Sequence, residues 1–247
     1  MLTKAKMLTG YSLHCLDGEI GKVVEFYFDD QHWGIRYLVA NTGNWLTGKQ
    51  VLISPYALIA VDAVAGNIRV NLTKRQIEEG PPLDTDKPVS RQFEQDYYAY
   101  YGWPMYWSGR YMWGYSPFLA RDPAQWREPV QGGEAWNPHL RSMNDVSGHT
   151  IQASDGEIGH VDDFIIDDET WAIRYFIIDT QNWWPGKHVL VAPQWIDKIS
   201  WSESTVFVNL TRDSIMQSPE YTGQELVSRD YEIGLHHHYN RKGYWAK

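Results

Sequence analysis

The chain has little of what marks a secreted, membrane-spanning or nucleic-acid-binding protein. It contains one cysteine, Cys15, in 247 residues, which excludes an internal disulfide. No apolar run reaches the roughly 18 residues of a membrane-spanning helix, and the N-terminal stretch lacks the continuous apolar core of a signal peptide. We therefore expect a soluble, cytoplasmic protein with no integral membrane part.

Positive charge is also scarce. Lys and Arg number 22 against 31 Asp and Glu, which gives a formal net charge of −9. There is no basic run, and most of the acidic excess lies after residue 110. Because affinity for nucleic acids comes mainly from neutralising phosphates with Lys and Arg, we expect no nucleic-acid partner.

What the chain does have is an internal repeat. Residues 10–83 align with residues 148–221 at a constant offset of 138 and without a gap. A period of this length predicts two copies of a small domain and argues against a solenoid of short units. The clearest matches are DGEIG at 17–21 and 155–159, VNLT at 70–73 and 208–211, and Tyr106-Trp107 with Tyr244-Trp245.

Each copy has the pattern of about six short strands. The Asp17-Gly18 dipeptide predicts a tight hairpin. In the strand that follows, Phe26 and Phe28 alternate but Val23 is out of phase with them, which predicts a β-bulge. The segment 33–42 is apolar on both faces, so we expect a strand that is covered on both sides. This spacing is typical of a small barrel or sandwich.

Helix signals follow the strands. Thr73 and Gln76 form a capping-box pattern, and Ser90 and Ser228 stand where they can cap a longer helix after each copy. Apart from the Tyr106-Trp107 match, residues 103–147 have no counterpart and read as an irregular connector rich in Trp, Tyr, Pro and Gly. We therefore divide the chain into a first barrel (8–84), a helix with an aromatic connector (85–147), a second barrel (148–222) and a C-terminal helix and tail (223–247).

The order of motifs D-G-E-I-G, W-x-I-R-Y, N-W-x-x-G-K-x-V-L and V-N-L-T resembles the PRC-barrel family. That family is named for the photosynthetic reaction centre H subunit and also occurs in the ribosome maturation factor RimM. The resemblance covers nearly all of both copies. It implies an all-β fold with short helices, made of two tandem antiparallel PRC-type β-barrels related by pseudo-two-fold symmetry. It also implies a docking or assembly module and not a catalyst.

Two groups of charged residues have alternative interpretations. Arg36 and Arg174 lie in the middle of apolar strands, where they point either to a partner's carboxylate or to an internal one, with Asp29 and Asp167 as candidates; we favour internal pairing. The second group is an acidic patch. Because the spacing of a calcium loop is absent from it, we favour a solvated turn over a cation site. The patch consists of Asp162, Asp163, Asp167, Asp168 and Glu169.

The histidine run His236, His237 and His238 suggests either a metal site or a protonatable surface run, and we favour the surface run. We expect no catalytic residue, no cofactor and no metal. The sequence has no G-x-S-x-G elbow, and Cys15 has no counterpart at Ala153.

The aromatic stretch after residue 96 is the strongest candidate for a binding surface, because Tyr and Trp dominate the energetics of protein interfaces. The same residues could instead fix the connector onto the barrels or stack on a carbohydrate. The surface that we predict consists of Trp103, Tyr106, Trp107, Tyr111 and Trp113.

Taken together, these features predict a non-enzymatic scaffold or adaptor that mediates protein–protein assembly. One alternative is a small-ligand-binding protein or enzyme with a pocket at the barrel–barrel junction. Another is peripheral membrane association through the aromatic connector. A homo-oligomer is compatible with the sequence.

Overall fold

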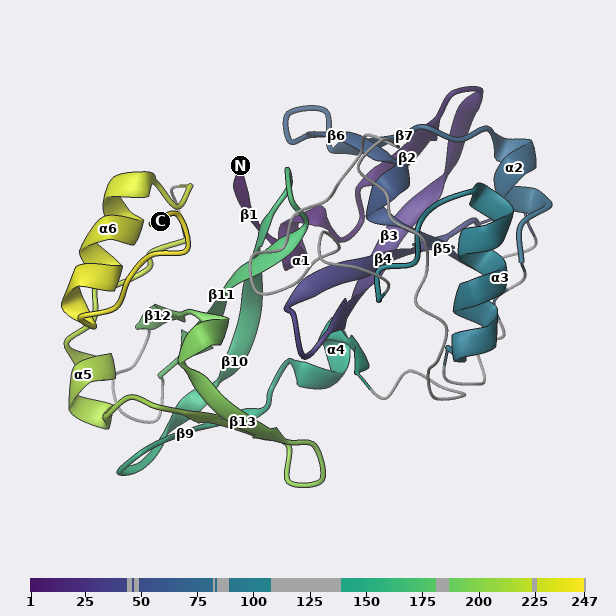
Figure 1. Cartoon of the computed structure of the whole chain (residues 1–247). Coiled ribbons are helices and arrows are strands. Elements are labelled where there is room, and N and C mark those ends of the chain that lie inside the picture. Colours follow the sequence, from purple (N-terminus) through teal and green to yellow (C-terminus); the bar gives the residue numbers. More distant parts are fainter. Residues whose placement is uncertain are drawn as a thin grey trace. The chain divides into compact units, whose positions relative to one another are not determined.

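The computed structural model describes residues 1–43, 46, 49–81, 83, 89–107, 139–180, 187–223 and 226–246 (Figure 1). The chain divides into two compact units. The first-half unit comprises Met7–Met143 and Asp168–Ala172, and the second-half unit comprises Met1–Lys6, Asn144–Asp167 and Ile173–Lys247. Within the described ranges, no helix has the length and apolar character needed to cross a membrane.

The first-half unit is built on an antiparallel sheet with one parallel pair. Its strands pair in the order β6–β7–β2–β3–β4–β5, with β2 and β7 parallel, and β8 pairs with the far end of β3. The strands are β2 (Ser12–Cys15), β3 (Gly18–Asp29), β4 (Gly34–Asn41), β5 (Gln50–Ile53), β6 (Leu58–Asp62), β7 (Asn67–Val70) and β8 (Leu140–Ser142). The helices that follow are η1 (Pro55–Ala57), α2 (Lys74–Glu78) and α3 (Arg91–Tyr101).

The second-half unit has the same order of elements. Its strands pair as β13–β14–β9–β10–β11–β12, with β9 and β14 parallel and with β1 on the far end of β10. The strands are β1 (Leu2–Lys4), β9 (Thr150–Ala153), β10 (Gly156–Asp167), β11 (Ala172–Asp179), β12 (His188–Val191), β13 (Ile196–Ser200) and β14 (Thr205–Val208). The helices are η3 (Pro193–Trp195), α5 (Arg212–Met216) and α6 (Arg229–His238), and two short helices, α1 (Ala5–Leu8) and α4 (Met143–Val146), lie at the unit boundaries.

The expected all-β fold with short helices is confirmed. In each unit the strand pairs form an open path among the described residues, so closed barrels remain a prediction. The register of β3 against β4 shifts between Val23 and Glu25, and again between Tyr27 and Phe28. These shifts confirm the predicted bulge in the first half, because they bring Val23, Phe26 and Phe28 all into the core.

Strand β4 is buried at every residue from Gly34 to Ala40, as its apolar pattern on both faces predicts. Its start was predicted wrongly, because Trp33 belongs to the turn and not to the strand. Trp33 adopts a left-handed conformation with φ of +59°, and Trp171 does the same at +57°. The Trp33 ring stacks on Phe28 at 5.7 Å, and we attribute the tolerance of this backbone strain to that burial of aromatic surface.

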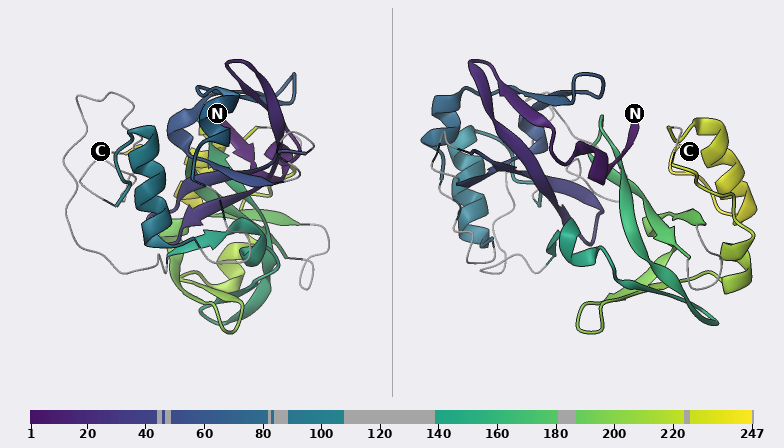
Figure 2. Two further views of the ribbon diagram at one scale, coloured as in Figure 1. Left: turned by 90° about the vertical axis from the view of Figure 1, so that its right-hand side faces the viewer. Right: turned by 180° about the vertical axis from the view of Figure 1, so that it is seen from behind.

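The predicted helix caps are confirmed. Thr73 and Gln76 form a capping box at the start of α2, and the side chains of Ser90 and Ser228 each accept a backbone N–H at the start of α3 and α6. Figure 2 shows α3 beside α2 and α6 beside α5 from two further directions. The hydroxyl of Tyr101 on α3 donates to the carbonyl of Gln76 on α2 at 3.3 Å, which joins the first pair of helices.

The end of the aromatic connector is more ordered than the sequence predicts. Residues 140–146 form β8 and α4, where an irregular segment was expected. Leu140 pairs opposite Asp29, and Leu2 pairs opposite Asp167 in the same register. Each unit therefore takes one strand from the segment that precedes the other half. Strands of three residues show no alternation, so the sequence carried no signal for them.

Two glycines allow the close crossing of the long hairpin in each half, and they provide a test of the fold. A Cβ on Gly21, whose φ is +140°, would lie 2.0 Å from the carbonyl oxygen of Asn41, and one on Gly159 would lie 2.0 Å from that of Asp179. We predict that Gly21→Ala or Gly159→Ala lowers the free energy of unfolding by on the order of 3 kcal/mol in urea denaturation.

The matched control is Gly234→Ala in the middle of α6, where a Cβ meets nothing within 4 Å. This substitution should raise stability by about 0.5–1 kcal/mol, because alanine is the better helix former. Tolerance of Gly21→Ala at wild-type stability would show that the hairpin crossing is not constrained as described.

Candidate functional site

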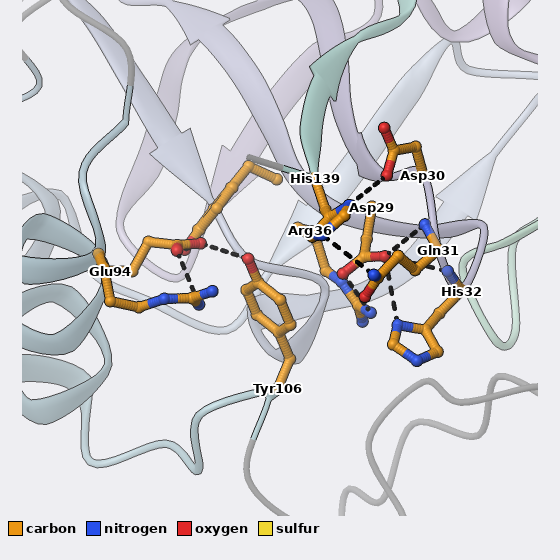
Figure 3. A network of polar contacts seen from close by, with 10 residues as sticks. Asp29, Asp30, Gln31, His32, Arg36, Glu94, Tyr106 and His139 are labelled. Atoms are coloured by element: carbon orange, nitrogen blue, oxygen red, sulfur yellow. Dashed lines mark hydrogen bonds and ion pairs between the residues drawn. The ribbon is translucent and has the colours of Figure 1, made fainter. Parts of the chain in front are cut away.

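The charged residues of the first-half unit converge on the centre of β4 and the end of β3 (Figure 3). Arg36 is fully buried, and its Nη2 lies 3.3 Å from Oδ2 of Asp29. The other oxygen of Asp29 accepts the backbone N–H groups of Gln31 and His32 at 2.9 and 3.0 Å. Burial alone would raise the pKa of Asp29, but Arg36 and His32 outweigh it and hold that pKa well below its usual range.

A second buried carboxylate stands on the helix that follows the sheet. Glu94 of α3 has no exposed surface, and its Oε1 accepts the hydroxyls of Tyr37 at 3.0 Å and Tyr106 at 2.6 Å. Its Oε2 accepts a hydrogen bond from Nη1 of Arg91 at 3.1 Å. Burial raises the pKa of Glu94, and the hydrogen bonds from Tyr106 and Tyr37 and the charge of Arg91 only partly oppose it.

Tyr106 joins the two carboxylates into one network. Its hydroxyl binds Glu94, while its ring lies 4.1 Å from the guanidinium carbon of Arg36, a cation–π geometry. We call Asp29, Arg36, Tyr37, Arg91, Glu94 and Tyr106 the Arg–Tyr–Glu network. It fastens α3 and the chain that returns after α3 to the central strand of the sheet.

The second-half unit contains the same network at matching positions. Arg174 pairs with Asp167 at 2.7 Å and lies 4.0 Å from the ring of Tyr244. Glu232 accepts the hydroxyl of Tyr175 at 2.8 Å and pairs with Arg229 at 2.8 Å. The prediction that the strand arginines pair internally with Asp29 and Asp167 is confirmed. Because the network occurs in both halves, we assign it a structural role.

The network of the first half has an extension at the end of β3. At the end of β3, Asp30 accepts a hydrogen bond from Nε of Arg141 at 3.0 Å. It also contacts Nδ1 of His139 at 2.8 Å (Figure 3). Both partners lie at the start of β8, so these contacts hold that strand on β3 next to the network.

Beside α3 lies a surface hollow of about 380 Å³. Within the described residues its lining includes no charged side chain and combines four aromatic rings with two amides. The ring of Trp103 stacks on Tyr101 at 4.6 Å and 13°, and on Tyr56 at 5.9 Å and 26°. Tyr100 stands perpendicular to Tyr101 at 4.8 Å and is 42% exposed. The lining residues are Tyr56, Asn71, Leu72, Gln76, Tyr100, Tyr101 and Trp103.

The matching positions in the second half are filled in a different way. His238, which matches Tyr100, contacts the carbonyl of Ser214 at 2.8 Å. Arg241, which matches Trp103, donates to the carbonyl of Asn209 at 3.4 Å. Trp195 packs 4.7 Å from Tyr239. The aromatic hollow is therefore described in the first half only, while the network beneath it is shared.

Comparison with known proteins agrees with this sheet. Residues 17–77 match the model of the PRC-barrel domain family. This part of the chain belongs to that family. A protein from Deinococcus radiodurans described as "Uncharacterized protein" is 31% identical over 96 residues, which are 38% of this chain and 34% of the relative. The chain thus spans about a third of that relative's length.

The PRC-barrel match begins at the β2–β3 hairpin and ends within α2, so the aromatic residues of the predicted surface lie outside it. Tyr106 is 4% exposed and belongs to the network. Trp107 is half-buried over Arg91 at 4.1 Å, and Trp103 lines the hollow. Tyr111 and Trp113 lie outside the described residues.

Sequence reasoning missed Tyr56, Tyr100 and Glu94 as site residues. Tyr100 lies within the aromatic stretch after residue 96 but outside the predicted surface, and Tyr56 comes from η1, far from that stretch in sequence. Glu94 carried one signal that could have found it: it stands three residues after Arg91, and the second copy repeats this spacing with Arg229 and Glu232.

The histidine run is not the surface run that we predicted. His236 is buried next to Trp195 at 5.1 Å, and its Nε2 lies 3.0 Å from the hydroxyl of Tyr175. Burial lowers the pKa of His236. Only His237 of the three is exposed. No group of three or more His, Cys, Asp or Glu within the described parts of the chain is arranged to hold a metal ion.

The acidic patch is likewise not one solvated turn. Asp163 is 2% exposed and accepts the backbone N–H groups of Lys6 at 3.2 Å and Phe164 at 2.8 Å. Asp162 pairs with the ammonium of Lys6 at 2.7 Å, and Asp167 belongs to the network. The alternation of β10 puts Asp163 on the inner face, where it binds the backbone at the start of α1.

Removal of the buried carboxylate tests the network. We predict that Glu94→Ala lowers the free energy of unfolding by about 3–5 kcal/mol, because it leaves Arg91 and two tyrosine hydroxyls buried without their acceptor. Glu94→Gln should cost less than half as much, since the amide oxygen still accepts from Tyr37 and Tyr106. Urea denaturation measures both values. Equal costs for the two variants would contradict the hydrogen-bond arrangement.

The pH dependence of stability tests Asp163. Burial raises its pKa to about 6, whereas the unfolded value is about 3.9. Its contribution to stability is thus present below about pH 4 and is lost as the pH rises through about 6. We predict that Asp163→Asn is more stable than wild type at pH 7.5 by on the order of 2 kcal/mol, and that this advantage disappears near pH 4.

The neighbouring Asp162→Asn is the control for Asp163, because its side chain is 35% exposed and its partner Lys6 is 60% exposed. Its effect should stay within about 0.5 kcal/mol at both pH values. Thermal melts from pH 4 to 7.5 give the comparison. A stability difference between Asp163→Asn and wild type that does not change with pH would contradict the assignment.

Proposed function

We propose that the chain is a non-enzymatic scaffold or adaptor that mediates protein–protein assembly. Its body consists of two tandem PRC-type barrels related by an approximate two-fold axis. The family match at residues 17–77 supports the first barrel. The second barrel is supported by the identical order of strand pairs and by the offset of 138 between the bounds of β3 and β10.

The buried charged groups support a structural role in place of a catalytic one. Glu94 has a raised pKa, which in an open cleft would suggest an acid or a base. Here both of its oxygens are occupied by Tyr37, Tyr106 and Arg91, and it has no exposed surface. Glu232 repeats the arrangement in the second half. A rigid scaffold requires that its helices be fixed to its sheets, and the two copies of the Arg–Tyr–Glu network would do this in both halves.

The observation that carries the proposal is the aromatic hollow of the first half. The network fixes α3 in the first half and α6 in the second, but the outward positions next to these helices differ. Tyr100 and Trp103 align with His238 and Arg241. Half-exposed Tyr and Trp give large contact area with little loss of side-chain freedom, which makes them frequent anchors at interfaces. The first half thus presents a surface that is suited to a partner, and the second half has different residues at the matching positions.

An affinity pull-down with the full-length chain tests the proposal. We predict that Tyr100→Ala and Trp103→Ala each reduce recovery of the specific partners at least about tenfold, since an interface anchor is worth about 2 kcal/mol or more. The matched controls are His238→Ala and Arg241→Ala at the corresponding positions of the second half, which should leave recovery unchanged. Urea denaturation of each variant establishes that the fold is intact.

Two results would refute the proposal. One is a partner set that Tyr100→Ala and Trp103→Ala leave unchanged. The other is a set that the second-half controls reduce equally, which would trace the loss to general destabilisation and not to the hollow. Tyr100 is the more informative position, because its exposed ring contributes least to the core.

A further inference from the structure

The chemistry of the hollow limits what can occupy it. The seven described lining residues are uncharged. A charged group on the occupant would therefore find no opposite charge in the lining, and its removal from water would cost free energy. Asn71, Gln76 and Tyr100 are exposed residues, and their amide and hydroxyl groups can donate hydrogen bonds. An uncharged ligand with free carbonyl groups matches this lining.

The ring geometry separates an extended peptide from a sugar. A pyranose stacks on a broad open aromatic face, but Trp103 is itself stacked on both Tyr101 and Tyr56. With the Trp103 ring stacked between these two partners and Tyr100 perpendicular to Tyr101, the rings offer an occupant their edges more than one open face. Grooves between Tyr and Trp ridges accept the rings of proline in polyproline II segments. Such segments lack internal hydrogen bonds, so their carbonyls are free to accept from neighbouring donors.

The size of the hollow agrees with a short anchor. Its volume of about 380 Å³ is at the low end of the range of about 300–1,000 Å³ for ligand sites. One turn of polyproline II takes three residues and about 9 Å. The hollow therefore holds one such turn and not a folded domain.

We propose that the aromatic hollow of the first half binds an uncharged, proline-rich segment of a partner protein in the polyproline II conformation. This inference rests on the proposed scaffold function, because it names the chemistry by which the partner is held. The second half does not share the site: Arg241 and His238 introduce polar and protonatable groups and bond to backbone carbonyls there.

Fluorescence anisotropy with a labelled oligoproline peptide tests the inference on the full-length chain. A glycine–serine peptide of the same length is the control ligand, and maltohexaose is the competing sugar. We predict saturable binding of oligoproline with a Kd on the order of 10–100 μM, no binding of the glycine–serine peptide, and no displacement by maltohexaose.

The variants locate the binding. Tyr100→Ala and Trp103→Ala should each weaken oligoproline binding at least about tenfold, whereas His238→Ala and Arg241→Ala should change it less than about twofold. Trp103→Phe keeps an aromatic ring and should retain most of the affinity, which guards against a loss caused only by misfolding.

Three outcomes would overturn the inference: no oligoproline binding above the glycine–serine control, binding that Tyr100→Ala and Trp103→Ala leave intact, or displacement by maltohexaose. If the pull-down still depends on Tyr100 and Trp103 while oligoproline fails, the scaffold function stands and the ligand class is wrong. If neither measurement depends on these residues, both proposals fall.

Discussion

The burial of an arginine in the middle of a sheet is the constraint on which the rest of the structure depends. Arg36 is completely buried, and a buried cation is tolerated only when it is paired and surrounded by well-placed partners. Asp29 supplies the charge and the ring of Tyr106 supplies a cation–π face. Tyr106 comes after α3, so the chain must return across the sheet to provide it. The helix, the loop and the strand are thereby held in one arrangement.

The two halves show which positions this constraint controls. Asp167, Arg174 and Tyr244 repeat the inner contacts of the first half, with a shorter arginine–aspartate distance and nearly the same cation–π distance. A change to any one member would leave a buried charge or hydroxyl without its partner, so these positions had little freedom to differ. Tyr100 faces outward on α3 and is under no such constraint. The matching position in the second half is accordingly a different residue, His238.

Local features of the structure could be predicted from the sequence, while the site largely could not. The hairpin at Asp17-Gly18, the bulge near Val23 and the caps at Ser90 and Ser228 depend on neighbouring residues, and all of them form. The left-handed Trp33 has no local signal, since only its tertiary stacking stabilises it. The hollow escaped prediction for the same reason, because Tyr56 and Trp103 meet only through the fold. The internal pairing of the strand arginines was foreseeable, because a buried guanidinium requires a carboxylate.

The exchanged strands explain why the two halves occur in one chain. β1 pairs with β10 and β8 pairs with β3 in the same register, so each unit is completed by the segment before the other half. A strand of three residues makes few hydrogen bonds and could not associate firmly from a separate molecule. Within one chain its effective concentration is high, and a weak contact becomes a stable one. Glu25, Asp30 and Asp163 reinforce it by binding Ser142, Arg141 and the backbone of Lys6. These side-chain contacts, together with the strand pairing, hold each three-residue strand on the long strand of its own unit.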